Sequence, residues 1–348
     1  FHAGFESFSG GFVGVDVFFV LSGYLITSIL LAEIAEGRFS LLGFYERRAR
    51  RILPALYFVM LVTLPVAFRL MLPDEFEGFT HALISVLFFA SNIYFWQTTD
   101  YFSRAAEENP LLHTWSLGVE EQYYMLFPLG LVLLWRLGPR GALAGIVAGS
   151  LGSLVLAELA VHRWPVPTFF LLPTRAWELG LGSLAAFHLS RRGLVRAPGR
   201  LAGAAAAAGP VMILASVALY DGDTPFPGLY ALLPTVGTVL VVLYADPASL
   251  AGRLLSWRPV VFLGLISYSA YLWHQPLLVF ARLASFRLPG DGLMLGLSVL
   301  SLVLAALTWR FLSSCQSDLG AEAVTAMLDR KSTRLNASLH RSPRTPSS

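Results

Sequence analysis

The sequence has little charge and almost no cysteine. Charged residues make up only 14% of its 348 positions, whereas 55% are hydrophobic. A soluble domain usually carries about 25% charged residues, so this low share favours a chain that is surrounded largely by lipid. The single cysteine, Cys315, excludes an internal disulfide framework and a metal cluster built on cysteine. The formal net charge is only +3, and the arginines gather in short loops, a pattern of membrane anchoring rather than nucleic-acid binding.

Long apolar segments occupy most of the chain. A helix that crosses a bilayer needs about 20 mostly apolar residues, and the segments that approach this length are 11–32, 53–72, 79–97, 115–135, 141–161, 169–188, 201–220, 229–245, 260–281 and 292–312. We therefore predict an all-α fold, a polytopic transmembrane helix bundle with about 10 membrane helices. Because the sequence opens at Phe1-His2-Ala3 without a methionine, we expect its first membrane helix to be truncated.

The loops between these segments differ in charge. Arginine is concentrated in the loops 38–51, 136–140, 191–200 and 253–258. Loops rich in Lys and Arg stay in the cytoplasm, so we place all of these inside. The acidic or neutral loops then lie outside, at 73–78, 98–112 and 221–228.

One apolar segment does not fit this topology as a simple crossing. An even number of crossings must connect the cytoplasmic loops that end at residue 51 and begin at residue 136, yet three apolar segments lie between them. We expect 79–97 to be re-entrant or interfacial, because it carries His81, Asn92 and Gln97. The alternative is that all three cross and that one arginine loop breaks the charge rule.

The chain changes character near its end. Residues 1–312 form the predicted membrane domain. Residues 313–348 have no apolar period and end in a stretch rich in Ser, Pro and Arg. We expect this tail to be disordered or non-native sequence.

Ionisable side chains inside the apolar segments are expensive, at about 2.5–3.5 kcal/mol each on insertion scales. With the topology above, they fall in the outer half of the membrane or near its centre: Asp16, Glu120, Glu121, Arg175, Glu178 and His274, with His2 at the outer end of the first helix. Chance would scatter them through both halves. We therefore predict one polar cavity open to the outer side, where acid–base chemistry can run with water excluded.

Each of these residues also has a purely structural interpretation. Asp16 could cap its helix or pair with an arginine, and Arg175 and Glu178 stand three apart on one helical face, as in a structural ion pair. The remaining alternatives are an interfacial position for Glu120 or Glu121, a bond to a backbone carbonyl for His274, a place at a helix end for His2 and an aromatic belt for Trp115.

The loop sequence Arg47-Arg48-Ala49-Arg50-Arg51 has two interpretations. It could anchor the topology and contact anionic lipids. It could also bind an anion, because arginines three apart share a helix face and their guanidinium groups match phosphate geometry. A phosphorylated acyl carrier held from the cytoplasm would need such a site.

Several stretches, taken in order, resemble the acyltransferase-3 family of membrane O-acyltransferases, which modify O-antigen lipopolysaccharide, peptidoglycan and other surface glycans. The resemblance rests on Phe1-His2, on Gly14–Leu25 with its Phe-x-x-Ser-Gly pattern, on Phe44–Pro54 with Arg-x-x-Arg, on His113–Tyr124, on Arg175–Gly182 and on Ser267–Leu277. His113–Tyr124, which reads HTWSLGVEEQYY, is the most specific of them.

The resemblance implies a bacterial inner-membrane O-acetyltransferase with cytoplasmic acyl-CoA (acetyl-CoA) as donor and an extracytoplasmic glycan hydroxyl as acceptor. It requires no tightly bound cofactor, no metal and no nucleic acid. His2 would be the general base or carry the acyl group briefly, and Glu120 or Asp16 would orient its ring. The donor and acceptor would be bound by Arg47, Arg48, Arg50, Arg51, Ser22, Gly23, Trp115, Arg175, Glu178, Tyr271 and His274.

The match departs from the family near its end, since Trp309-Arg310-Phe311 is followed by Leu312-Ser313-Ser314 in place of the usual Glu and Pro. The first half also resembles members that carry an esterase-like domain outside the membrane, a possible partner of this chain. The second functional class to weigh is a transporter or flippase of a polar or anionic solute without covalent chemistry. An assembly or sensor protein is a third, although it leaves the outer polar cluster without a purpose.

Overall fold

The computed structural model describes residues 2–4, 6–98, 108–192, 199–245, 249–285 and 289–312. Within these ranges every regular element is a helix, which confirms the all-α prediction. The predicted tail at 313–348 lies outside the described residues, as does most of the loop 98–112. The elements are η1 (Glu6–Val13), α1 (Gly14–Ala35), α2 (Leu41–Leu70), α3 (Pro73–Leu87), α4 (Ser91–Thr98), α6 (Thr114–Trp135), α7 (Gly138–Val161), α8 (Pro165–Phe170), α9 (Leu172–Arg192), α10 (Gly199–Leu219), η2 (Leu229–Ala231), α11 (Leu232–Tyr244), α12 (Leu250–Leu255), α13 (Arg258–Leu283) and α14 (Asp291–Leu312).

Five helices in the described part of the chain are both long enough and apolar enough to cross a membrane. They are Phe8–Ala35, Leu41–Leu70, Gly138–Val161, Leu201–Leu219 and Asp291–Leu312. The helices α6, α9 and α13 are also longer than 20 residues, but they carry many of the buried polar side chains, which lowers their mean hydropathy. The protein is thus a multi-pass membrane protein, and the total of about 10 crossings stays a prediction.

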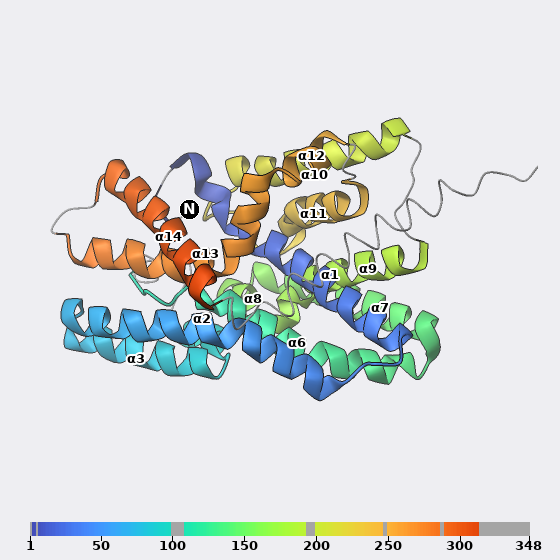
Figure 1. The fold of residues 1–348 in the computed structure, drawn as a ribbon, viewed down its shortest axis with the longest axis horizontal. Coiled ribbons are helices and arrows are strands. Elements are labelled where there is room, and N and C mark those ends of the chain that lie inside the picture. Colours follow the sequence, from blue (N-terminus) through green and yellow to red (C-terminus); the bar gives the residue numbers. More distant parts are fainter. Residues whose placement is uncertain are drawn as a thin grey trace, which may run out of the picture.

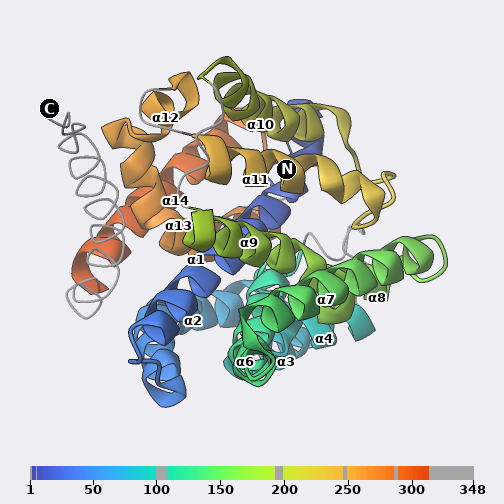
Figure 2. The same ribbon diagram turned by 90° about the vertical axis from the view of Figure 1, so that its right-hand side faces the viewer.

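The helices α1 and α9 run through the middle of the bundle, between α10 and α11 on one side and α6 and α7 on the other (Figures 1 and 2). Two glycines allow their close approach. A Cβ atom on Gly23 of α1 would lie 1.9 Å from the carbonyl oxygen of Leu179, and one on Gly182 of α9 would lie 1.9 Å from that of Val20. Small residues are the usual means of bringing two membrane helices together. Gly23 therefore packs against a helix, and its predicted part in substrate binding stays a prediction.

Polar side chains join this helix pair to α6. Thr27 of α1 donates a hydrogen bond of 2.8 Å to the hydroxyl of Ser183 on α9, and that hydroxyl lies 3.0 Å from the hydroxyl of Tyr123 on α6. All three side chains are buried. The central helices are thus held by matched hydroxyl groups as well as by apolar packing.

The segment 79–97 is not one helix. The chain breaks between α3 and α4 at residues 88–90, where Phe89 has a positive φ of 52°. At about 1.5 Å per residue, the 15 residues of α3 and the 8 residues of α4 are each too short to cross about 30 Å of hydrocarbon. A broken, non-spanning segment at this point agrees with the topology expected from the arginine loops.

Replacing Gly182 with Ala is expected to destabilise the folded protein by at least about 1–3 kcal/mol, because the added methyl group forces α1 and α9 apart. The measurement is the thermal unfolding midpoint in detergent. Gly149→Ala is the matched control, because Gly149 lies on the long helix α7 with open space at its Cβ. Equal midpoints for the two variants would contradict the role given to Gly182.

Candidate active site

A cavity of about 160 Å³ lies where the N-terminal segment meets the start of α6 and the middle of α13. Its lining side chains come from three parts of the chain that are far apart in sequence: His2, Gly11, Phe12, Gly14, Val15, His113, Trp115, Ser116, Tyr271 and His274. Of the residues predicted to form one outer site, His2, Trp115, Tyr271 and His274 do meet here.

Three histidine rings surround this cavity. The ring centroid of His274 lies 5.4 Å from that of His2 and 5.2 Å from that of His113. Hydrogen bonds fix two of these histidines in place. Arg282 donates to the backbone carbonyl of His2, and Nδ1 of His274 lies 2.7 Å from the carbonyl oxygen of Tyr271, one turn earlier on α13. This last contact matches the structural alternative for His274 and still leaves its ring on the cavity wall.

Tyr271 fixes the start of α6 to α13. Its hydroxyl donates to the carbonyl oxygen of His113 at 2.5 Å and lies 3.0 Å from the hydroxyl of Ser116. The ring of Tyr271 also packs edge-on against the ring of His113, with the centroids 4.9 Å apart. These contacts determine the orientation of His113 relative to His274.

Burial keeps two of these imidazoles neutral. It lowers the pKa of His2 and of His113 well below the ordinary value, and the nearby His274 lowers both further. A neutral imidazole can accept a proton at neutral pH, which a general base must do. The cavity can therefore take a proton from a hydroxyl group that enters it.

His113 is the site residue that the sequence reasoning missed. It directly precedes α6, outside the apolar segment 115–135, so a search for charges inside membrane segments passed over it. The available signal was its place at the head of the motif HTWSLGVEE. In the structure, His113, Trp115 and Ser116 of this motif all line the cavity.

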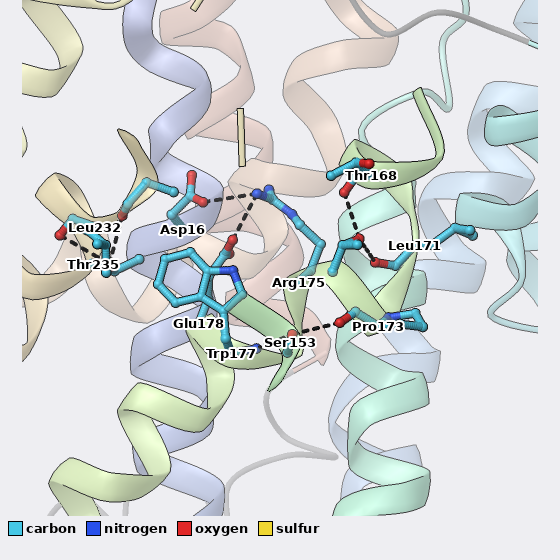
Figure 3. Close-up of polar contacts among 12 residues, drawn as sticks. Asp16, Ser153, Thr168, Leu171, Pro173, Arg175, Trp177, Glu178, Leu232 and Thr235 are labelled. Carbon is cyan, nitrogen blue, oxygen red and sulfur yellow. Dashed lines mark hydrogen bonds and ion pairs between the residues drawn. The ribbon is translucent and has the colours of Figure 1, made fainter. Parts of the chain in front are cut away.

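Asp16 lies in a separate ion cluster and does not line the cavity (Figure 3). One guanidinium nitrogen of Arg175 contacts Asp16 at 3.2 Å and Glu178 at 2.9 Å, and all three side chains are buried. The carboxylate of Asp16 pairs with Arg175, in agreement with the structural alternative, and the role of Asp16 in orienting His2 stays a prediction. The cluster connects α1 to α9, and Ser153 of α7 supports it by accepting a bond from the backbone of Trp177.

This ion cluster still bears on the cavity, because Arg175 lies behind one of its walls. The Arg175 guanidinium carbon is 5.3 Å from the ring centroid of Trp115 and 5.3 Å from that of Phe169. Cation–π contacts of this kind are stronger when the groups are out of water. Arg175 thus packs against Trp115, Glu178 pairs with Arg175, and neither residue lines the cavity.

Glu120 belongs to a third cluster, deeper along α6. It follows His113 by seven residues, or about 10 Å along a helix axis. Its carboxylate accepts bonds from the hydroxyls of Ser22 at 2.7 Å and Tyr124 at 2.5 Å, and the role of Glu120 in orienting His2 stays a prediction. Ser22 is buried in this bond and does not line the outer cavity.

Arg48 completes the third cluster. It lies 2.9 Å from Glu121 and 3.6 Å from Glu120, and its guanidinium carbon is 4.0 Å above the Tyr124 ring. The other arginines of the loop 38–51 differ in their partners: Arg47 pairs with Glu33, Arg50 pairs with Glu46 at 2.5 Å, and Arg51 is exposed on the same helix. The predicted phosphate site therefore has at least three of its four arginines bound to carboxylates.

A second cavity of about 350 Å³ opens between the ends of α1 and α6 on the predicted cytoplasmic side. It is lined by Ile34, Gly37, Phe39, Val132, Trp135 and Arg136. Within the described ranges, Arg136 forms no ion pair with a carboxylate, so its charge stays available. In the same ranges no three His, Cys, Asp or Glu residues are grouped so as to hold a metal ion.

Comparison with known proteins gives one consistent result. The family described as "Acyltransferase domain" matches residues 1–313. The O-acetyltransferase OatA of Staphylococcus aureus (strain MRSA252) is 32% identical over 355 residues, which cover 95% of this chain and 57% of the relative. The putative peptidoglycan O-acetyltransferase YrhL of Bacillus subtilis is 34% identical over 80% of the chain and 46% of its own length.

A third relative is the peptidoglycan O-acetyltransferase OatA of Listeria monocytogenes, which is 32% identical over 80% of the chain and 46% of its own length. The chain thus spans about half the length of the curated relatives that it matches. No solved structure matches it.

Replacing Arg175 with Met should destabilise the protein by about 3–5 kcal/mol, because two carboxylates then remain buried without a counter-charge. Arg163→Met is the matched control, since Arg163 is exposed just past the end of α7 and its guanidinium carbon lies 5.3 Å from the Trp164 ring centroid, with no ion pair to a carboxylate of the described residues. Thermal unfolding in detergent measures both variants. An unchanged midpoint for the Arg175 variant would show that the buried cluster is not structural.

Proposed function

The chain belongs to the acyltransferase domain family, and from this premise we propose that it transfers an acyl group, acetyl as in its named relatives, to a hydroxyl of a cell-surface glycan. The observation that carries the proposal is the cavity surrounded by the imidazoles of His2, His113 and His274. Neutral imidazoles accept the proton that a hydroxyl loses as its oxygen attacks a carbonyl carbon.

Peptidoglycan is the acceptor that the relatives favour over lipopolysaccharide, since two of the proteins compared are named as acting on it. A glycan chain lies outside the cell membrane, and the topology expected from the arginine loops puts the histidine cavity toward that side. In the proposed reaction, a carbon–oxygen bond forms to the sugar and the donor's carbon–sulfur bond breaks. The proton of the sugar hydroxyl finally goes to the departing thiolate. His2 either holds this proton in transit or carries the acyl group between donor and acceptor.

The donor is proposed to be acyl-CoA, bound from the cytoplasmic face of the bacterial inner membrane. Arg47, Arg48 and Arg50 already face carboxylates, so the charge left for the donor's phosphates on this face includes Arg136. Beside it, Phe39 and Trp135 present aromatic rings to the same cavity. Planar arginine groups suit phosphate and aromatic rings suit a nucleotide base, so the nucleotide end of the donor fits this second cavity.

The third cluster lies between the two cavities. The acyl end of the donor must pass the level of Glu120, Ser22 and Arg48 to reach the histidines, because α1, α2 and α6 meet there. In this proposal the donor contacts Arg136 in the second cavity, which contributes to its affinity. Its acyl end contacts the histidines of the outer cavity, which carry out the chemistry.

Changing His2 to Ala in the full-length protein should lower acylation of the cell-wall glycan by about 10²–10⁴-fold while the protein stays in the membrane. Mass spectrometry of the isolated glycan measures the acyl content. His81→Ala is the control, because His81 is exposed on α3, away from the cavity. Normal acylation by the His2 variant, or acylation that does not depend on the gene at all, as a transporter predicts, would overturn the proposal.

Changing Arg136 to Glu should raise the KM for acyl-CoA at least about 10-fold and leave kcat nearly unchanged, because the inner cavity binds the donor and takes no part in the chemistry. Steady-state kinetics with purified full-length protein make the measurement. Arg163→Glu, at the opposite end of α7 from the cytoplasmic loop, controls for the change in charge. An unchanged KM would remove the donor from the inner cavity and leave the outer site untouched.

A further inference from the structure

His113 stands out among the buried polar residues because it has no hydrogen-bond partner for either ring nitrogen. Both Nδ1 and Nε2 are buried without a partner among the described residues, and the side chain is only 4% exposed. Nearly all buried polar groups in proteins are paired, so an exception calls for an explanation such as a catalytic role or a bound molecule. The ring is on the wall of the outer cavity, which has room for such a molecule.

The surroundings hold this ring in place without using its nitrogens. Tyr271 binds the backbone carbonyl of His113 at 2.5 Å and packs against its ring, and His274 packs edge-on at 5.2 Å. The groups that face it are the imidazoles of His2 and His274 and the phenol of Tyr271, while Arg282 donates to the backbone carbonyl of His2. A fixed, neutral imidazole at a cavity wall, whose ring nitrogens have no partner among the described residues, is able to accept a hydroxyl proton.

We propose that His113 is a second catalytic residue, the base for the acceptor, and that His2 reacts with the donor. The inference rests on the proposed function and assigns its two half-reactions to two different histidines. In the first half, a ring nitrogen of His2 attacks the thioester carbonyl, a carbon–nitrogen bond forms and the carbon–sulfur bond breaks. The thiolate leaves and takes the proton that His2 loses.

In the second half, His113 takes the proton of the sugar hydroxyl while the sugar oxygen attacks the acyl carbon on His2. The carbon–oxygen bond forms and the carbon–nitrogen bond breaks. His113 then returns the proton to His2, which restores both rings. His274 lies between the two, 5.4 Å and 5.2 Å from their ring centroids, and is the group best placed to pass this proton between them.

The experiment separates the two halves in the full-length membrane protein. The donor half is measured as exchange of the acyl group between acetyl-CoA and isotopically labelled CoA, and the complete reaction as acylation of a soluble peptidoglycan fragment. For His113→Gln we expect exchange within about threefold of the unaltered protein and transfer lowered by about 10²–10⁴-fold. For His2→Ala we expect both to be lost.

His162→Gln is the matched control, because His162 is exposed at the end of α7 and lines no cavity, and both activities should stay normal. A second variant guards against a purely structural effect. In His113→Ala, added imidazole should restore part of the transfer, since it can occupy the vacated space and accept the proton. A residue needed only for packing would not be rescued in this way.

The results that overturn the inference differ from those that overturn the proposed function. Transfer at the normal rate by His113→Gln, loss of exchange in parallel with transfer, or absence of exchange in the unaltered protein would each refute the division between the two histidines. Absence of any transfer by the unaltered protein would refute the proposed function itself.

Discussion

A charge that is taken out of water inside a helix bundle needs an opposite charge beside it, and this requirement sorts the polar residues of the chain into two groups. Asp16 and Glu178 share Arg175, and Glu120 and Glu121 share Arg48, so these groups join helices and are committed to one another. The histidines differ because a neutral ring can be buried without a counter-charge. They line a cavity, and neither ring nitrogen of His113 has a hydrogen-bond partner in the part of the chain that the structure describes.

The ion clusters and the cavity depend on the same packing of helices. The close contact at Gly23 and Gly182 brings α1 against α9, and Arg175 can then reach across to Asp16. The same guanidinium lies against Trp115, whose other side faces the cavity. The close packing of α1 and α9 at these two glycines thus determines where an aromatic wall of the candidate site lies. The buried charge of Arg175 thus lies against this wall without lining the cavity itself.

The sequence predicted the helices well because bilayer thickness sets their length. Each predicted segment falls on one described helix or on two consecutive ones. It was less informative about the site for a physical reason. Position along a helix estimates the depth of Glu120 or Asp16 but not the direction of the side chain, and a rotation of one residue, about 100°, decides which partner it meets. His113 escaped the search because it lies at a helix start outside any apolar run. The sequence of the arginine loop showed its positive charge, but it did not show which carboxylates pair with these arginines in the fold.

The central claim is that the histidine cavity opens to the outside and receives the acceptor there. Gly14 tests it most directly, because it lines the cavity, is exposed and has open space for a side chain. The measurement is the rate at which a membrane-impermeant thiol reagent modifies Gly14→Cys in intact cells expressing the full-length protein with Cys315→Ser. The account predicts rapid modification from outside that a soluble peptidoglycan fragment slows. Modification only from the cytoplasmic side, or a rate that the glycan leaves unchanged, would contradict it.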